Sequence, residues 1–220
     1  MIDIAREIES VGREVGTGRL GSSEAKVVRL QRTYDAAIAD VWNALTTPER
    51  ISRWFLPISG DLRLGGHYQF EGNAGGEILE CDRPNRLKVT WVFGPAGEAP
   101  PSEVVVRLAE VDAERTRFDL EHTAVVPDEM WDTYGPGAVG VGWDSALLGL
   151  DLHISTDASV TPETAMQWMM SDEGKRFIRE SSDAWRDASI AFGTDAELAR
   201  ASGERTRRAY SGEPLDDTKG

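Results

Sequence analysis

The chain has 220 residues, 40% hydrophobic and 28% charged, a composition typical of a soluble globular protein with one core domain and additions. Its 24 lysines and arginines are outnumbered by 38 aspartates and glutamates, and the formal net charge of −14 disfavours nucleic acid and anionic membranes as partners. A single cysteine excludes an internal disulfide, and no apolar run is long enough to span a membrane. We therefore expect a cytoplasmic protein without membrane insertion.

The amino-terminal residues 1–20 carry the first regular pattern. Four aliphatic residues recur there at helical spacing: Ile4, Ile8, Val11 and Val15. Glycines at positions 16, 18 and 21 then interrupt the pattern. The spacing predicts an amphipathic appendage, residues 1–24, whose apolar stripe packs on the core domain or on a second subunit.

A strand and two short helices are predicted next. Residues 26–34 have strand character, whereas residues 36–45 and 48–55 have the apolar spacing of helices. The second helix ends in Trp54 and Phe55, two large adjacent aromatics beside a surface loop. Such a pair either fills space in the core or contacts a ligand, and both roles are compatible because a cavity wall is also core.

Five segments with a two-residue period follow, separated by turn-like sequences. They are residues 62–71, 76–82, 87–93, 103–110 and 116–123. Because their links are too short for crossover helices, they predict an antiparallel meander, and with the first strand a sheet of about six strands. Alternation places one apolar and aromatic row on each strand. The side chains of that face are Leu62, Leu64, Tyr68, Phe70, Leu87, Val89, Trp91, Phe93, Val104, Val106, Leu108, Phe118, Leu120 and His122.

A long helix is predicted over residues 138–154, "AVGVGWDSALLGLDLHI". Its apolar stripe contains Trp143, Leu147, Leu150 and Ile154. Asp144 and Asp151 fall on the opposite side. We expect the stripe to cover the apolar face of a curved sheet, with the two short helices closing one end of the space between them.

The carboxy-terminal third predicts further helices near residues 162–170, 172–192 and 195–209. The middle helix has one apolar stripe, formed by Phe177, Ile178, Ser181, Trp185, Ala188 and Phe192. The domain boundaries that follow are a core domain at residues 25–154, a helical extension at 155–210 and a disordered tail at 211–220. The extension covers the core, caps a cavity or forms a homodimer, as the amino-terminal helix also could.

Four stretches in order carry a resemblance to a known family: "RTYDAAIADVWNALTTPERISRWF", "GGEILECDRPNRLKVTW", "TRFDLEHTAV" and "GVGWDSALLGLDLHI". Over about residues 27–153 the chain resembles bacterial relatives of the activator of the 90-kilodalton heat-shock chaperone ATPase, members of the START-like (SRPBCC) superfamily. The resemblance implies an α+β helix-grip fold, a curved antiparallel sheet around a long helix. It also implies a deep, mostly apolar cavity suited to lipid-, aromatic- or polyketide-like molecules.

Eleven side chains are expected to line that cavity. They are Trp54, Phe55, Tyr68, Phe70, Trp91, Phe93, Phe118, Leu120, His122, Trp143 and Leu147. His122 continues the inward row of its strand and is the candidate general acid or base, with Tyr68 as its companion. The alternative, which we favour, is a core histidine whose ring is satisfied by hydrogen bonds, because spacing alone identifies no catalytic partner.

Other chemistry has little support in the sequence. His67, His122 and His153 fall in different elements without metal-ligand spacing, so we expect no metal and no cofactor. Cys81 lies between Glu80 and Asp82, which disfavour a reactive thiolate. The G-x-G-x-x-G at residues 135–140 lacks the preceding strand of a dinucleotide site, so a flexible lead into the long helix is the better interpretation.

Three functions remain open at this point. The first choice is non-catalytic binding of a hydrophobic small molecule, because it needs only an apolar sheet, a covering helix and few polar groups. A cyclase- or hydrolase-like enzyme would use the same cavity with His122 and a partner. A co-chaperone would act through an exposed apolar surface outside the cavity.

Overall fold

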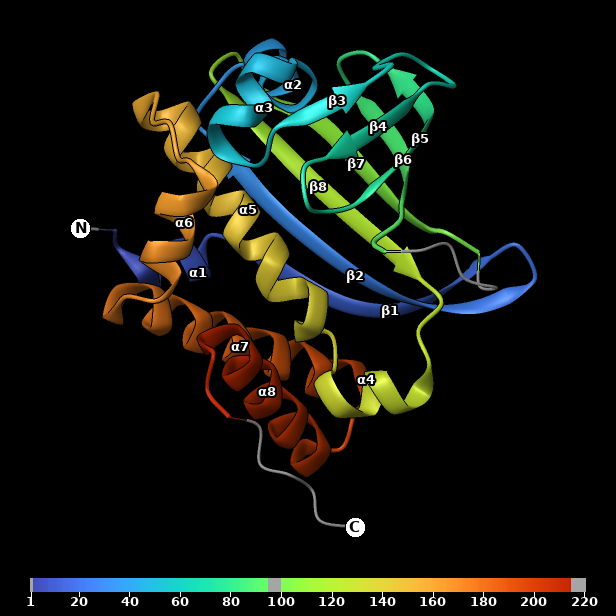
Figure 1. The fold of residues 1–220 in the computed structure, drawn as a ribbon, viewed down its shortest axis with the longest axis vertical. Coiled ribbons are helices and arrows are strands. Elements are labelled where there is room, and N and C mark those ends of the chain that lie inside the picture. Colours follow the sequence, from blue (N-terminus) through green and yellow to red (C-terminus); the bar gives the residue numbers. More distant parts are fainter. Residues whose placement is uncertain (1, 95–99, 215–220) are drawn as a thin grey trace.

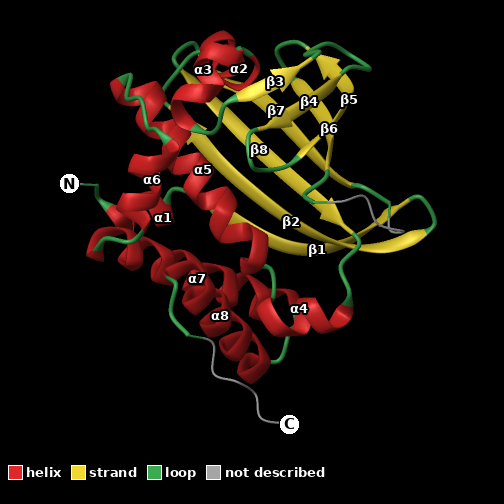
Figure 2. Ribbon diagram, viewed as in Figure 1, coloured by secondary structure: helices red, strands yellow, loops and turns green. Residues whose placement is uncertain are grey.

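An eight-stranded antiparallel sheet curves around a long helix in the computed structural model, which describes residues 2–94 and 100–214 (Figures 1 and 2). The strand order is β1-β2-β8-β7-β6-β5-β4-β3. The strands are β1 (Gly12–Leu20), β2 (Ser23–Tyr34), β3 (Ile58–Gly60), β4 (His67–Phe70), β5 (Gly75–Asp82), β6 (Arg86–Trp91), β7 (Ser102–Asp112) and β8 (Arg115–Ala124). The predicted antiparallel meander is therefore confirmed.

Helix α5 (Gly137–Thr156) crosses the concave face of the sheet, and the two short helices α2 (Ile38–Thr46) and α3 (Pro48–Trp54) cover one end (Figure 1). The other helices are α1 (Ile4–Glu9), α4 (Asp128–Tyr134), α6 (Pro162–Met169), α7 (Asp172–Phe192) and α8 (Ala196–Ser211). This is the expected helix-grip arrangement with additional carboxy-terminal helices.

The amino-terminal prediction was wrong over most of its length. Only α1 is helical, whereas Gly12–Leu20 is an edge strand paired with β2 from Gly12 opposite Gln31 to Leu20 opposite Ser23. A spacing of four residues keeps side chains on one face of a helix and also on one face of a strand, so Val11 and Val15 fit both structures. Their glycine-interrupted surroundings favour the strand, where the partner β2 supplies the backbone hydrogen bonds.

The predicted strand over residues 62–71 is shorter in the structure. Residues 61–66 form a loop in which Gly65 has a φ of +76°, and the strand begins only at His67. The three-residue strand β3 and helix α4 were not predicted, because each is too short to show a period. Adding β1 and β3 gives eight strands where about six were expected.

The three carboxy-terminal helices have the predicted bounds to within two residues. Helix α7 packs on α5 and on β1, and its Ile178 and Trp185 belong to the same buried cluster as the side chains of the sheet. Ile4 of α1 packs on Leu148 of α5 and Phe177 of α7. The amino-terminal helix and α7 thus cover the side of α5 that faces away from the sheet.

Two buried arginines, which form three ion pairs, hold these layers together. Asp144 of α5, 2% exposed, accepts from the Arg13 Nε of β1 at 3.0 Å and from Ser181 and Trp185 of α7. Arg32 of β2, also buried, pairs with Glu7 of α1 at 2.8 Å and with Asp151 of α5 at 2.7 Å. The prediction that the two aspartates lie on the side of α5 away from the sheet was wrong, because both pair with arginines of sheet strands and α7 helps to bury Asp144.

The glycines at residues 135–140 are contact points for the carboxy-terminal helices and not a flexible lead into α5. A Cβ built on Gly140 would lie 2.2 Å from Trp185 Cε2, and one on Gly137 would lie 3.0 Å from Thr206 Cγ2. Thr206 of α8 also donates to the carbonyl oxygen of Tyr134 at 2.7 Å. Helix α8 ends at Ser211, so the first residue of the predicted tail, residues 211–220, is helical. Residues 215–220 of that tail lie outside the described residues.

Candidate ligand cavity

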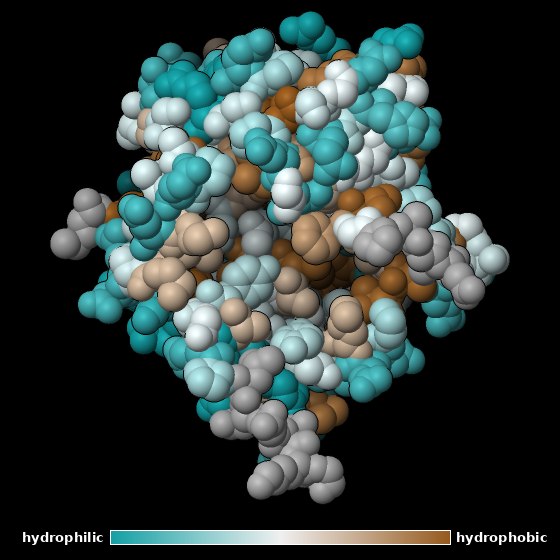
Figure 3. Space-filling model, in the orientation of Figure 1, coloured by the Kyte–Doolittle hydropathy of each residue, from teal (hydrophilic) through white to brown (hydrophobic). Residues whose placement is uncertain are grey.

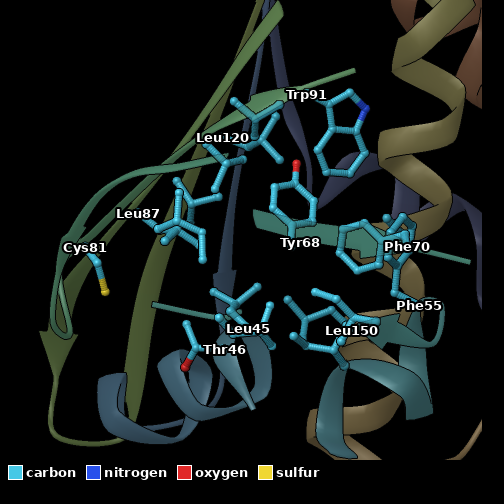
Figure 4. A pocket seen from close by; sticks show the side chains of 18 of the residues that line it. Leu45, Thr46, Phe55, Tyr68, Phe70, Cys81, Leu87, Trp91, Leu120 and Leu150 are labelled. Carbon is cyan, nitrogen blue, oxygen red and sulfur yellow. The ribbon is translucent and has the colours of Figure 1, made fainter. Parts of the chain in front are cut away.

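A cavity of about 170 Å³ lies between the inner face of the sheet and α5, with α2 and α3 over one end (Figure 4). Nearly all of its wall is aliphatic or aromatic. The lining residues are Leu45, Thr46, Ile51, Trp54, Phe55, Ile58, Leu62, Arg63, Leu64, Tyr68, Phe70, Ile78, Cys81, Leu87, Val89, Trp91, Val104, Val106, Phe118, Leu120, Trp143, Ala146, Leu147 and Leu150. Strand alternation supplies the sheet side of this wall, and helical spacing supplies the α5 side.

An aromatic cluster forms one wall of the cavity. Phe55 meets Phe70 edge-on at a centroid distance of 4.9 Å, and Trp91 lies 5.7 Å from Phe70 and 4.9 Å from Trp143. The Trp54 Nε1 donates to the carbonyl oxygen of Ala44 at 3.0 Å, which fixes its ring against α2. The adjacent aromatics at the end of α3 therefore serve both as packing between helix and sheet and as cavity wall.

The few polar groups of the wall are either satisfied or at its edge. The Tyr68 hydroxyl donates to the carbonyl oxygen of Thr90 at 2.7 Å, and burial raises the pKa of this phenol, so it stays neutral. Thr46 and Cys81 lie on the same side of the space (Figure 4), where Cys81 is exposed as a free thiol. Arg63 is an exposed residue of the wall and pairs with Asp61 at 2.7 Å. The interior thus offers a ligand an apolar surface.

His122 is buried next to this cavity but does not line it. Its Nδ1 accepts a hydrogen bond from Trp143 Nε1 at 3.1 Å, so its Nε2 carries the proton and donates to Ser102 Oγ at 3.1 Å. The Ser102 hydroxyl in turn donates to the carbonyl oxygen of Trp91. Burial lowers the pKa of His122 to about 4. The ring is therefore neutral at pH 7, with both nitrogens engaged.

Nine of the eleven side chains predicted for the cavity lie in its wall. Phe93 does not: β6 ends at Trp91, alternation stops there, and the Phe93 side chain is 72% exposed. His122 is separated from the cavity by Trp143, whose ring lies 5.8 Å from it. The two candidate catalytic groups are not bonded to each other: the Tyr68 hydroxyl donates to Thr90, and the His122 ring bonds to Ser102 and Trp143.

Sequence reasoning missed the part of the wall that comes from outside the meander. Leu45 and Ile51 belong to the two short helices, and Ile58 to the unpredicted β3. Val104, Val106 and Val89 share the apolar face that alternation predicts, which is the signal that could have identified them. Leu62 and Leu64, which alternation assigned to the apolar face of a strand, reach the wall from the loop before β4.

No metal site is evident in the part of the chain that the structure describes, because no three His, Cys, Asp or Glu side chains come together there. His67 is exposed on β4, and His153 is buried, with its Nε2 accepting from Arg50 at 3.1 Å. Among the described residues, no helix combines the length and apolar character needed to span a membrane.

Comparison with known proteins identifies relatives of this fold. The family described as "Activator of Hsp90 ATPase homolog 1-like protein" matches residues 35–154, more than half of the chain. The crystal structure of CalU16 from Micromonospora echinospora is 35% identical, with a TM-score of 0.65, and the match covers 81% of this chain and 98% of CalU16. Its solution structure is 32% identical over 92% of this chain and 93% of CalU16, with a TM-score of 0.60.

A more distant structure shares the fold alone. The conserved protein of unknown function EF2215 from Enterococcus faecalis is 15% identical, with a TM-score of 0.53 and coverage of 76% of this chain and 92% of EF2215. A search of curated proteins gave no match. The matches to CalU16 extend beyond residues 35–154 and therefore include part of the added elements.

Proposed function

We propose that this chain, which belongs to the family of Activator of Hsp90 ATPase homolog 1-like proteins, binds a hydrophobic small molecule between the sheet and α5. The observation that carries the proposal is the cavity itself. It is enclosed by aliphatic and aromatic side chains from strands β3 to β8, from α5 and from the two short helices. Concave, mostly apolar sites with few polar groups are typical of small-molecule binding.

The size and walls of the cavity narrow the class of ligand. An engineered apolar cavity of about 150 Å³ holds a benzene molecule, so a cavity of about 170 Å³ accepts one aromatic ring or a short alkyl chain. Since the interior presents no free buried charge, the ligand's polar groups would face the exposed edge at Thr46, Arg63 and Cys81. Lipid-like, aromatic and polyketide-like molecules each have an apolar part of this kind.

The proposed binding is non-catalytic. A general acid or base must lie within hydrogen-bond reach of the bound molecule, and the wall's buried titratable group, Tyr68, is neutral and already donates to Thr90. His122 faces Trp143 and Ser102 with both nitrogens engaged. The expected activity is therefore uptake and release of an unchanged ligand.

A cavity-filling variant tests the proposal. Ala146 is a wall residue on α5 and is 7% exposed, whereas Ser155 lies exposed near the end of the same helix. We expect Ala146→Leu to weaken binding of benzene-sized aromatics, measured by calorimetry, at least tenfold. Ser155→Leu should leave their affinity unchanged. Equal affinities in the wild type and Ala146→Leu would contradict binding in this cavity.

A further inference from the structure

A second hollow, of about 90 Å³, lies beyond Trp143 toward the start of α5. Its wall is formed by Lys26, Val28, His122, Ala124, Val126, Met130, Trp131, Gly135, Ala138 and Val139. Figure 3 shows apolar side chains gathered in the middle of one face, between α5 and the link from β8 to α4. Met130 and Val139, 54% and 39% exposed, lie at the outer side of this hollow.

Both spaces lie between the same two elements, β8 of the sheet and helix α5. On β8, Phe118 and Leu120 line the main cavity, and the next inward residues, His122 and Ala124, line the second hollow. The same order holds along α5: the main cavity is lined by Trp143, Ala146, Leu147 and Leu150, and the second hollow by Ala138 and Val139. The backbone geometry that encloses the first space therefore continues through the second.

Only side chains separate the two spaces. The hydrogen bond between Trp143 Nε1 and His122 Nδ1, 3.1 Å long, joins the helix to the sheet between the two spaces. The Trp143 ring also lies against the Trp91 ring, tilted by 49° at a centroid distance of 4.9 Å, and the Trp91 carbonyl accepts from Ser102, the other partner of His122. Trp91 and Ser102 thus hold the Trp143–His122 pair in place.

We propose that the Trp143–His122 pair is a partition that opens for an elongated, largely apolar ligand, which then occupies both spaces. This inference rests on the proposed function, because it extends the same binding site. Trp143 is suited to the movement because it is only half-buried and has one polar atom to release. Together the two spaces approach the lower end of the volumes typical of drug-sized ligands, which the main cavity alone does not reach.

The second hollow is itself suited to an apolar chain or ring. Apart from His122, its polar side chain is Lys26, whose ammonium lies 5.4 Å over the Trp131 ring and 3.8 Å from Asp128. Both Lys26 partners come from the α4 region at the edge of the hollow, so the interior between Val28, Ala124 and Val139 is aliphatic. A ligand that crosses the partition would therefore be apolar over most of its length.

A series of linear alcohols from 1-hexanol to 1-tetradecanol tests this inference on the wild-type protein. Each methylene group that enters an apolar site tightens binding about fourfold. We expect the dissociation constant, measured by calorimetry, to keep falling with chain length after the main cavity is full. The methyl resonance of Ala124, which lines the second hollow and not the main cavity, should shift with the long alcohols and stay unchanged with the short ones.

Two substitutions at His122 separate the partition from general packing. His122→Leu removes the acceptor for Trp143 without changing the wall of the main cavity, so it should tighten binding of long alcohols about fivefold and leave 1-hexanol unaffected. His122→Gln keeps an acceptor for the indole and a donor for Ser102, and should bind like the wild type.

The outcomes are distinguishable. If short alcohols bind, but affinity stops rising with chain length and the Ala124 methyl resonance never moves, the partition stays closed and this inference is wrong while the proposed function stands. If no alcohol of any length binds, both are overturned. If His122→Leu and His122→Gln bind long alcohols equally, the hydrogen bond is not what closes the partition.

Discussion

His122 shows how burial fixes the chemistry of a single side chain. Its Nδ1 can accept from Trp143 only while that nitrogen is unprotonated, and its Nε2–H is used by Ser102. A histidine that projects toward an apolar space thus acts as a neutral link between α5, β8 and the start of β7. This arrangement supports the core-histidine interpretation over a general acid or base.

The low pKa of His122 predicts a specific dependence of stability on pH. The folded protein holds this pKa near 4, below the ordinary 6.5, so the unfolded chain takes up the proton first as the pH falls. Above about pH 6.5 His122 is neutral in both the folded and the unfolded chain, so its protonation does not change the free energy of unfolding there. It should lower that free energy between pH 6.5 and 4 by about 3 kcal/mol in total.

Urea unfolding of the wild type and His122→Gln at pH 7, 5.5 and 4.5 measures this contribution. Carboxylates titrate in both proteins, so the quantity of interest is the difference between the two pH profiles. The profiles should diverge below pH 6.5, with the wild type losing more stability. Parallel profiles would show that the His122 pKa is not depressed.

Trp91 is the centre of the aromatic cluster, in contact with Tyr68, Phe70, Phe55 and Trp143. Because it is half-buried, we expect Trp91→Ala to lower the free energy of unfolding by about 3 kcal/mol, the lower end of the range for large aromatic truncations in cores. Chemical denaturation measures this directly. A loss near zero would remove Trp91 from the packed wall.

At the scale of elements, the packing of α7 on α5 depends on the absence of a side chain at Gly140. A Cβ there would lie 2.2 Å from the buried Trp185 ring. Gly140→Ala should therefore lower the free energy of unfolding by about 2 kcal/mol, although alanine is the better helix former.

Gly203→Ala on α8 is the matched control for this prediction. Its Cβ would meet only ordinary contacts, the nearest being Arg186 Cβ at 3.4 Å, so this change should be neutral or stabilise by up to about 1 kcal/mol. Melting curves of both variants are sufficient. If Gly140→Ala stabilises the protein as much as Gly203→Ala does, α7 does not pack as the structure shows.

The buried carboxylate of Asp144 joins three elements, because Arg13 of β1 and Ser181 and Trp185 of α7 all donate to it. Asp144→Ala leaves the buried Arg13 without its carboxylate and should cost about 3–5 kcal/mol of stability. Asp151→Ala on the same helix should cost less, because Arg32 keeps Glu7 as a partner. Equal losses in denaturant titrations would contradict this difference.

Across the whole molecule, long periodic segments made most of the fold predictable. Alternation along β7 and β8 and helical spacing along α5 and α7 identified the sheet, the covering helix and the extension. The failures lie where one spacing fits two structures, as in Val11 and Val15, or where the chain is too short to show a period, as in β3.

The candidate site was predictable to the extent that it follows from strand parity. Trp91 and Leu120 were placed in the wall by alternation, and Phe93 failed because its strand ends before it. The hydrogen bond between Trp143 and His122 joins residues far apart in the chain, and nothing local in the sequence specifies it. The contact of Gly140 with Trp185 is likewise a property of tertiary packing.

Native mass spectrometry of the purified protein, followed by titration with a panel of fatty acids, linear alcohols and single-ring aromatics, tests the central claim most directly. The account predicts a one-to-one adduct with an apolar molecule, carried through purification or formed in the titration, and a weaker one in Ala146→Leu. A protein that stays free of adducts, with a melting temperature that no member of the panel changes, would contradict ligand binding in the cavity.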